Sequence, residues 1–82
     1  MAYRVVFTSG ADRAFAKLPP DVQRRIVTKV TALASNPRPS GAQTLQGRET
    51  AYLRIRVGDY RVVYSLNDTM LLVLVVRIAH RP

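Results

Sequence analysis

The stretch that decides the fold is YLRIRVGDYRVVY, residues 52–64 of an 82-residue chain. Apolar and polar side chains alternate with a period of two on both sides of a Gly-Asp dipeptide, a pattern typical of two strands joined by a two-residue hairpin loop. With such a loop, Arg56 lies directly opposite Arg61. One face of the hairpin then carries only apolar and tyrosine side chains, and the other carries Tyr52, Arg54, Arg56 and Arg61.

The pairing of Arg56 with Arg61 works against the stability of the hairpin, because like charges directly opposite each other in a sheet repel. A sequence that needed only to fold has little reason to keep such a pair. An anion bound between the two guanidinium groups would supply a reason. The hairpin therefore predicts an anion-binding face.

Composition indicates one small globular domain over residues 1–82, with 48% hydrophobic and 22% charged residues. The chain has no cysteine and one histidine, which argues against disulfides, thiolate metal sites and zinc sites built on imidazoles. The longest apolar run, residues 70–76, is too short to span a bilayer, and no secretory segment precedes the first strand. We expect a cytoplasmic protein with no metal and no cofactor.

The charge is the outlying property of this composition. Thirteen Lys and Arg residues against five Asp and Glu residues give a net charge of +8. This balance favours a nucleic acid, an acidic protein segment or an anionic membrane surface as partner. Most of the cations are arginines, whose planar fork binds phosphate through two hydrogen bonds. The alternative interpretation is a solvated basic surface without a ligand.

The remaining segments predict an α+β domain in the order β-α-α-β-β-β. A β-rich segment at 3–8 precedes a short amphipathic helix that stops at the Pro19-Pro20 pair, and a second helix runs from the prolines to near Asn36. Residues 37–47 are expected to form a loop. Two amphipathic helices should cover one face of a mostly antiparallel four-stranded sheet, leaving the arginine face open.

The last strand, within residues 70–78, is apolar on both faces, so its own sequence leaves its register open. A three-residue loop at 67–69 would place Arg77 on the face of Arg56 and Arg61. A two-residue loop would place Arg77 on the apolar face. The first arrangement is favoured, because it avoids burying an unpaired charge.

Few catalytic constellations can be identified in this sequence. It shows no serine–histidine–acid set, no paired carboxylates and no Gly-rich phosphate loop before a helix. Cleavage of RNA by attack of the 2′-hydroxyl on the adjacent phosphate needs cations, a proton acceptor and a proton donor. Arginine supplies the cations but transfers protons poorly. His80 is the one residue of a type that exchanges protons readily near neutral pH.

Over nearly its whole length the chain resembles the RelE/ParE superfamily of toxins from toxin–antitoxin systems. The resemblance rests on the order and spacing of YRVVFT, ADRAFAKLPPDVQRRI, NPRPSGAQTLQGRE, YLRIRVGDYRVVY and VRIAHR. It implies a cytoplasmic prokaryotic toxin that an acidic antitoxin neutralises. In the RelE branch, the toxin enters the ribosomal A site and cleaves mRNA within the codon without a metal.

The resemblance also implies roles for individual residues. The basic pair on the second strand of RelE-type enzymes falls on Arg54 and Arg56, and the arginine that grips the phosphate falls on Arg61. The cation near the C-terminus that assists the leaving group falls on Arg81, beside His80. We expect these five residues to form the catalytic site, with additional RNA contacts from Tyr52, Arg48 and Arg77.

Two departures from the RelE pattern keep other functions open. The chain has no tyrosine after Arg81, and it has arginine at the two strand positions where lysine is often found. The first alternative is the ParE branch, which shares the fold and poisons DNA gyrase. The second is a non-catalytic protein that acts only as the basic partner of an antitoxin.

Overall fold

The computed structural model describes residues 2–45 and 52–80. Its sheet has the strand order β1-β5-β4-β3-β2, in which β1 runs parallel to β5 and every other neighbouring pair is antiparallel. In chain order the elements are β1 (Arg4–Phe7), α1 (Ser9–Ala16), α2 (Pro20–Leu33), β2 (Gln43–Leu45), β3 (Tyr52–Val57), β4 (Tyr60–Asn67) and β5 (Leu72–His80).

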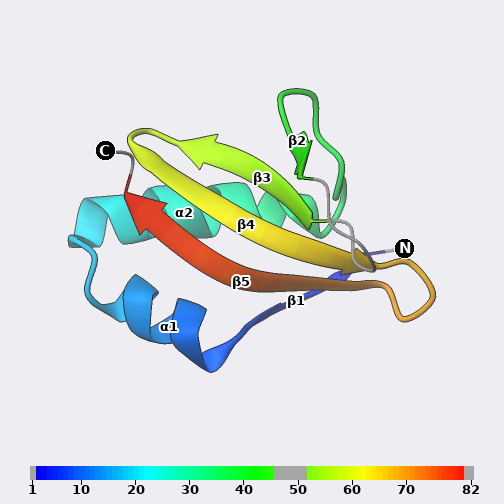
Figure 1. The fold of residues 1–82 in the computed structure, drawn as a ribbon, viewed down its shortest axis with the longest axis horizontal. Helices are drawn as coiled ribbons and strands as arrows, with labels where there is room; N and C mark the ends of the chain where they lie inside the picture. The colour runs from blue at the N-terminus through cyan, green and yellow to red at the C-terminus, as the bar shows by residue number, and fades with distance from the viewer. Residues whose placement is uncertain (1, 46–51, 81–82) are drawn as a thin grey trace.

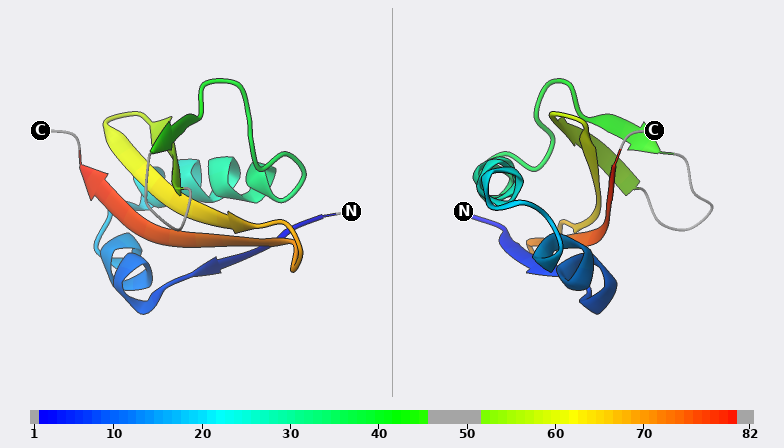
Figure 2. Two further views of the ribbon diagram at one scale, coloured as in Figure 1. Left: turned by 45° about the vertical axis from the view of Figure 1, so that its right-hand side comes forward. Right: turned by 90° about the vertical axis from the view of Figure 1, so that its left-hand side faces the viewer.

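In the view of Figure 1, α2 lies behind the sheet and α1 lies below it, beside β5, and the views of Figure 2 show the opposite face of the sheet without a helix over it. Helix α1 contacts β5 and β1, while α2 contacts β1 and β3. The α+β class and the two-helix layer are confirmed. The predicted strand count was wrong by one, because residues 43–45 of the expected loop form β2. Three residues are too few to show a strand period in the sequence.

Helix α1 begins at Ser9 because the Thr8 hydroxyl accepts a hydrogen bond from the Ala11 amide at 3.2 Å. This bond satisfies one of the free amides of the first turn. The apolar stripe of the helix then faces the sheet: Ala11 is buried, and the Phe15 ring meets the Phe7 ring of β1 edge to face with centroids 5.7 Å apart. The predicted helix and its inward face are confirmed.

Helix α2 has Pro20 in its first turn, where the fixed φ of proline suits a helix. Ile26, Val30 and Leu33 are buried against the sheet. The helix ends at Leu33 rather than near Asn36, because Ser35 and Asn36 both donate to the carbonyl of Ala32 in a closing turn.

The core lies between the helices and the sheet face that carries Val57, Val62 and Tyr64. Tyr64 is fully buried, and its hydroxyl donates to the carbonyl of Pro37 at 2.7 Å, which fixes the loop after α2. Burial raises the pKa of the Tyr64 phenol, since a charged phenolate would lose its hydration there. Every second side chain of the hairpin points into this core, which explains why apolar and polar residues alternate along it.

The register of β5 contains a bulge that the sequence did not indicate. Val63 pairs with Arg77 while Tyr64 pairs with Val75, so Val76 is an extra residue without a partner. The β4–β5 connection, residues 68–71, is longer than either predicted loop. Arg77 does lie on the arginine face, but the bulge puts it there and not a three-residue loop.

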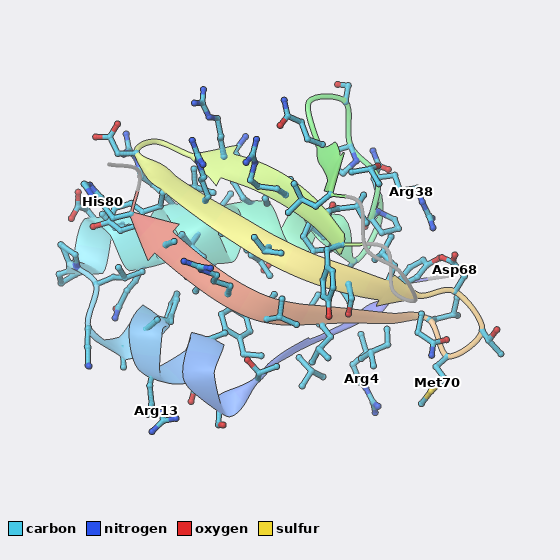
Figure 3. The ribbon with its side chains drawn as sticks, in the orientation of Figure 1. Arg4, Arg13, Arg38, Asp68, Met70 and His80 are labelled. Atoms are coloured by element: carbon cyan, nitrogen blue, oxygen red, sulfur yellow. The ribbon has the colours of Figure 1, made fainter. Side chains whose placement is uncertain are left out.

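An exposed cluster ties the N-terminus and the loop after α2 to the β4–β5 turn. Arg38 forms a two-pronged ion pair with Asp68, with nitrogen–oxygen distances of 2.9 and 3.3 Å, and the Tyr3 hydroxyl donates to the same carboxylate at 2.6 Å. Arg38 and Asp68 project side by side in Figure 3. The hydrogen bonds from Arg38 and then Tyr3 hold the pKa of the Asp68 carboxyl below its usual value.

The two helices of the described residues, α1 and α2, both lack the length and apolarity needed to cross a membrane.

Candidate nucleic-acid interface

The open face of the sheet gathers the arginines predicted from the hairpin. Across the central strands, Arg54 pairs with Val63 and Val63 with Arg77, while Arg56 pairs with Arg61. Residues that pair across a sheet project from the same face. This open arginine face therefore consists, among the described residues, of Arg54, Arg56, Arg61 and Arg77.

The open arginine face carries no acidic side chain in the described ranges, where the acids lie on the helices and in the turns, at Asp12, Asp21, Asp59 and Asp68. The ion pair of Arg38 with Asp68 is the one salt bridge found in residues 2–45 and 52–80. Within the described residues, the face thus concentrates four cations without a neutralising carboxylate.

Arg61 lies at the centre of this face and is half-buried, because β3 and β5 flank it on both sides. Its Nε atom is buried and finds no acceptor in the described part of the chain. A buried donor without an acceptor costs about 1–3 kcal/mol. Within the described residues, Arg61 thus combines two unfavourable features: a like charge directly opposite it, on Arg56, and a buried donor without an acceptor.

Arg54 and Arg56 lie beside a small hollow at the β2 side of the sheet. Its volume is about 200 Å³, and it is lined by Gly41, Gln43, Arg54 and Arg56. The Arg54 guanidinium donates to the Gln43 side-chain oxygen, which fixes its direction. Gln43 pairs with Arg54 in the β2–β3 register. Sequence analysis missed Gln43, because the segment that contains it was expected to be a loop.

His80 is placed on the other face of the sheet. It pairs with Tyr60, whose neighbours Val57 and Val62 point into the core, and its ring meets the Tyr60 ring at a centroid distance of 4.8 Å and an interplanar angle of 66°. Figure 3 shows His80 at the end of β5. The structure does not bring His80 onto the face of Arg54 and Arg61.

Tyr52 is on the open arginine face, since it pairs with Ser65 at the end of β3 away from the hairpin turn. It lies two positions from Arg54 and is half-buried. Arg48 and Arg81, the other two predicted site residues, lie outside the described residues.

The described face can bind anions through its guanidinium groups, which are rigid, planar and fully charged near neutral pH. Apart from the Tyr52 phenol, its described ionisable side chains are arginines, a residue type that transfers protons poorly. Among residues 2–45 and 52–80, no three His, Cys, Asp or Glu side chains gather closely enough to hold a metal ion. The geometry therefore favours electrostatic stabilisation over proton transfer.

This chain is similar in sequence and in structure to toxins of one superfamily, RelE/ParE. Residues 5–82 match the family described as the ParE toxin of the type II toxin–antitoxin system parDE. Over an alignment of 82 residues, the chain is 29% identical to an Escherichia coli protein described as a RelE-like toxin, covering 99% of this chain and 85% of that protein.

Two solved toxin structures share the fold. One chain in the crystal structure of the archaeal RelE–RelB complex from Pyrococcus horikoshii aligns with a TM-score of 0.88 and 29% identity, covering 99% of this chain and 97% of that one. A chain of the toxin–antitoxin complex RelBE2 from Mycobacterium tuberculosis aligns with a TM-score of 0.86, also at 29% identity, covering 99% and 93%. The chain thus belongs to the ParE toxin family within the RelE/ParE superfamily and is a RelE-like toxin of a type II toxin–antitoxin system.

Proposed function

We propose that this toxin binds the translating ribosome in the cytoplasm and cleaves mRNA, with Arg54, Arg56, Arg61 and Arg81 around the scissile phosphate. The observation that carries the proposal is the opposition of Arg56 and Arg61 on a sheet face whose described residues include no acid. Such a face is destabilising when empty and is neutralised by a bound phosphate.

The reaction would be a transfer within the RNA. The 2′-oxygen forms a bond to phosphorus and the bond from phosphorus to the 5′-oxygen breaks, which leaves a 2′,3′-cyclic phosphate and a 5′-hydroxyl. Negative charge grows on the non-bridging oxygens along this path. Fixed guanidinium groups stabilise that charge without reorganising, which is the largest contribution an enzyme face of this kind makes.

The proton of the 2′-hydroxyl needs an acceptor, and the leaving 5′-oxygen needs a donor. Apart from its arginines, the described part of the open arginine face carries one ionisable side chain, that of Tyr52, and His80 is on the opposite face. Arg81 is proposed to assist the leaving oxygen by charge. We therefore infer that the ribosome or its ordered water supplies the remaining proton transfers, and that cleavage depends on the ribosome.

An acidic antitoxin is proposed as the partner that silences the toxin. The matching structures from Pyrococcus horikoshii and Mycobacterium tuberculosis are toxin–antitoxin complexes. A net charge of +8 and an unneutralised arginine face favour an acidic segment as the partner of this chain. Carboxylates placed between Arg56 and Arg61 would remove their repulsion and compete with RNA.

Inhibition of DNA gyrase is the second candidate, because the matching family profile is that of ParE toxins. The scarcity of proton-transfer groups on the open arginine face also fits a toxin that binds and does not cleave. The third candidate function is that of a non-catalytic protein, which acts only as the basic partner of an antitoxin and does not inhibit cell growth.

One experiment in cells separates these functions. The toxin is expressed briefly, the 5′ ends of mRNA on translating ribosomes are mapped, and plasmid supercoiling is assayed in the same cells. The test variant is Arg61→Met. The matched control is Arg13→Met, on the exposed side of α1 away from the sheet (Figure 3).

New mRNA ends within codons that persist in Arg13→Met and disappear in Arg61→Met would support the nuclease. Intact mRNA together with gyrase-linked DNA breaks would refute the nuclease and support the ParE-like function. Normal growth with wild-type toxin would leave only the role of antitoxin partner.

A further inference from the structure

A second basic site lies on the helix side of the hairpin turn. A hollow of about 410 Å³ separates α2 from the end of β3. Its lining consists of Arg25, Thr28 and Lys29 from one side of α2, Arg56 and Val57 from β3, and Gly58 from the turn. Three of these six residues are cations that approach from two different elements. We call this hollow the hairpin notch.

The Arg25 side chain comes close to the hairpin turn at Gly58, where the backbone carries no side chain. Gly58 has a φ of +60°, and a Cβ built on it would lie 3.3 Å from the Arg25 Nη1 atom. Asp59 follows directly in the turn, yet no described ion pair joins it to Arg25, Lys29 or Arg56. Within residues 2–45 and 52–80, the charges of the hairpin notch have no carboxylate partner, so they can bind an external anion.

Arg56 connects the hairpin notch to the open arginine face. It lines the notch, and it also lines the 200 Å³ hollow beside Arg54. Strand β2 pairs with β3 only over residues 52–54, so the outer edge of β3 beyond Arg54 has no neighbouring strand in the described part of the sheet. A chain lying on the open face can pass around this free edge at Arg56.

We propose that Arg25 and Lys29, together with Arg56, bind a second backbone phosphate of a single-stranded RNA whose first phosphate lies at Arg54 and Arg61. This inference rests on the proposed RNA-binding function and adds a path for the strand. The RNA leaves the open arginine face around the free edge of β3 and enters the hairpin notch.

The lining favours RNA over an acidic protein segment. Val57 is the one aliphatic residue among the six that line the notch, so a peptide would bury little apolar surface there. A phosphate gains from charge and from the two-pronged guanidinium fork, which needs no apolar contact. The Thr28 hydroxyl donates to the Arg24 carbonyl, and its oxygen lone pairs remain available to the ribose hydroxyl.

The test measures RNA binding by the purified toxin as a function of salt. The probes are a trinucleotide and an oligonucleotide of about 12 nucleotides, within the site sizes of single-strand-binding grooves. Both carry 2′-O-methyl groups, which block cleavage. The notch variant is Arg25→Gln/Lys29→Gln. Its matched control is Arg24→Gln/Lys17→Gln, which removes the same charges from exposed positions that do not line the notch.

We expect the notch variant to bind the trinucleotide as the wild type does. For the longer probe, the slope of log affinity against log salt should fall in magnitude by about 0.7, because the notch variant loses its contact with one phosphate of a single strand. The control should change this slope by less than half as much. Equal thermal unfolding of both variants shows that folding is unaffected.

Two results would overturn the inference while leaving the proposed function intact. One is an equal salt slope for the notch variant and its control. The other is a notch variant that keeps full RNA affinity but no longer binds an oligoglutamate peptide, which would assign the notch to an acidic protein. A wild type that binds neither RNA probe would refute the proposed RNA-binding function and the inference together.

Discussion

The opposed arginines predict that removing a functional charge makes this protein more stable. The perturbation is Arg61→Met, which keeps a long apolar stem in the half-buried position but removes the guanidinium. Relief of the cross-strand repulsion with Arg56 is worth about 0.5 kcal/mol, within the range for opposed pairs in a sheet. Removal of the buried Nε without an acceptor adds about 1 kcal/mol, at the low end for such donors. We expect the free energy of unfolding to rise by about 1–2 kcal/mol.

Two further variants isolate the causes of this gain. Arg56 is exposed, so Arg56→Met relieves only the repulsion and should add about 0.5 kcal/mol. The variant that carries both changes should be less stable than the sum of the two single gains by about 0.5 kcal/mol, because the repulsion can be relieved only once. Arg54→Met is the contrasting control: Arg54 pairs with Val63 and donates to Gln43, so its loss should cost about 1 kcal/mol.

The assay is urea unfolding followed by circular dichroism at two salt concentrations. Between ~0.1 M and ~1 M NaCl the screening length falls from about 10 Å to about 3 Å, so the wild type should gain stability from salt and Arg61→Met should gain less. A lower free energy of unfolding for Arg61→Met, or full additivity of the changes at 56 and 61, would refute the reasoning. RNA binding should be lost in Arg61→Met despite its greater stability.

Three further predictions concern the hairpin turn, the core and the exposed cluster of Tyr3, Arg38 and Asp68. Gly58→Ala should lower the free energy of unfolding by about 1–2 kcal/mol, because alanine is strained at a φ of +60°; Gly10→Ala in α1 meets nothing within 4 Å and should raise it by about 0.5–1 kcal/mol, both measured by thermal unfolding. Tyr64→Phe should cost about 1 kcal/mol in urea unfolding, because the buried hydroxyl donates to the Pro37 carbonyl. The pKa of Asp68 is lower in the folded protein than its ordinary value of about 3.9, so the ionised carboxylate stabilises the fold at pH values above that. This stability is lost as the pH falls through the folded pKa. Asp68→Asn should therefore flatten the acid side of a curve of unfolding free energy against pH.

Each of these outcomes has a clear contrary result. Equal effects of alanine at 10 and 58 would show that the turn conformation is not strained by a side chain. An unchanged stability in Tyr64→Phe would mean that water satisfies the Pro37 carbonyl. An acid limb that is the same for Asp68→Asn and the wild type would assign the acid sensitivity to other carboxyls.

The hairpin was predictable because a two-residue loop and a period of two leave one register. The pairing of Arg54 with Val63 and of Arg56 with Arg61 follows from residues 52–64 alone and is confirmed. The same logic placed Tyr64 in the core. Helices α1 and α2 were also predictable, since their apolar positions and the prolines between them are local signals.

Strand β5 shows where this logic stops. Its residues are apolar on both faces, so the sequence contains no alternation that could locate the extra residue Val76. A slip of one residue moves every later side chain to the other face. His80 was expected in the catalytic site for a different reason, its chemistry and the family resemblance, and it lies against Tyr60. The hairpin notch was missed for another reason: Arg25 and Arg56 are far apart in sequence, and only the packing of α2 beside the turn brings them together.

The parallel pairing of β1 with β5 has a consequence for how this toxin is made. Strand β1 is synthesised first, but its only partner strand begins at Leu72, after every other element of the described chain. Helix α1 likewise rests mainly on β5. Contacts between such distant segments form late in folding, because the intervening loop must close first. A nascent chain that has not yet extended through β5 therefore lacks a completed sheet, so a cell translating this message holds no finished toxin until the last strand has emerged.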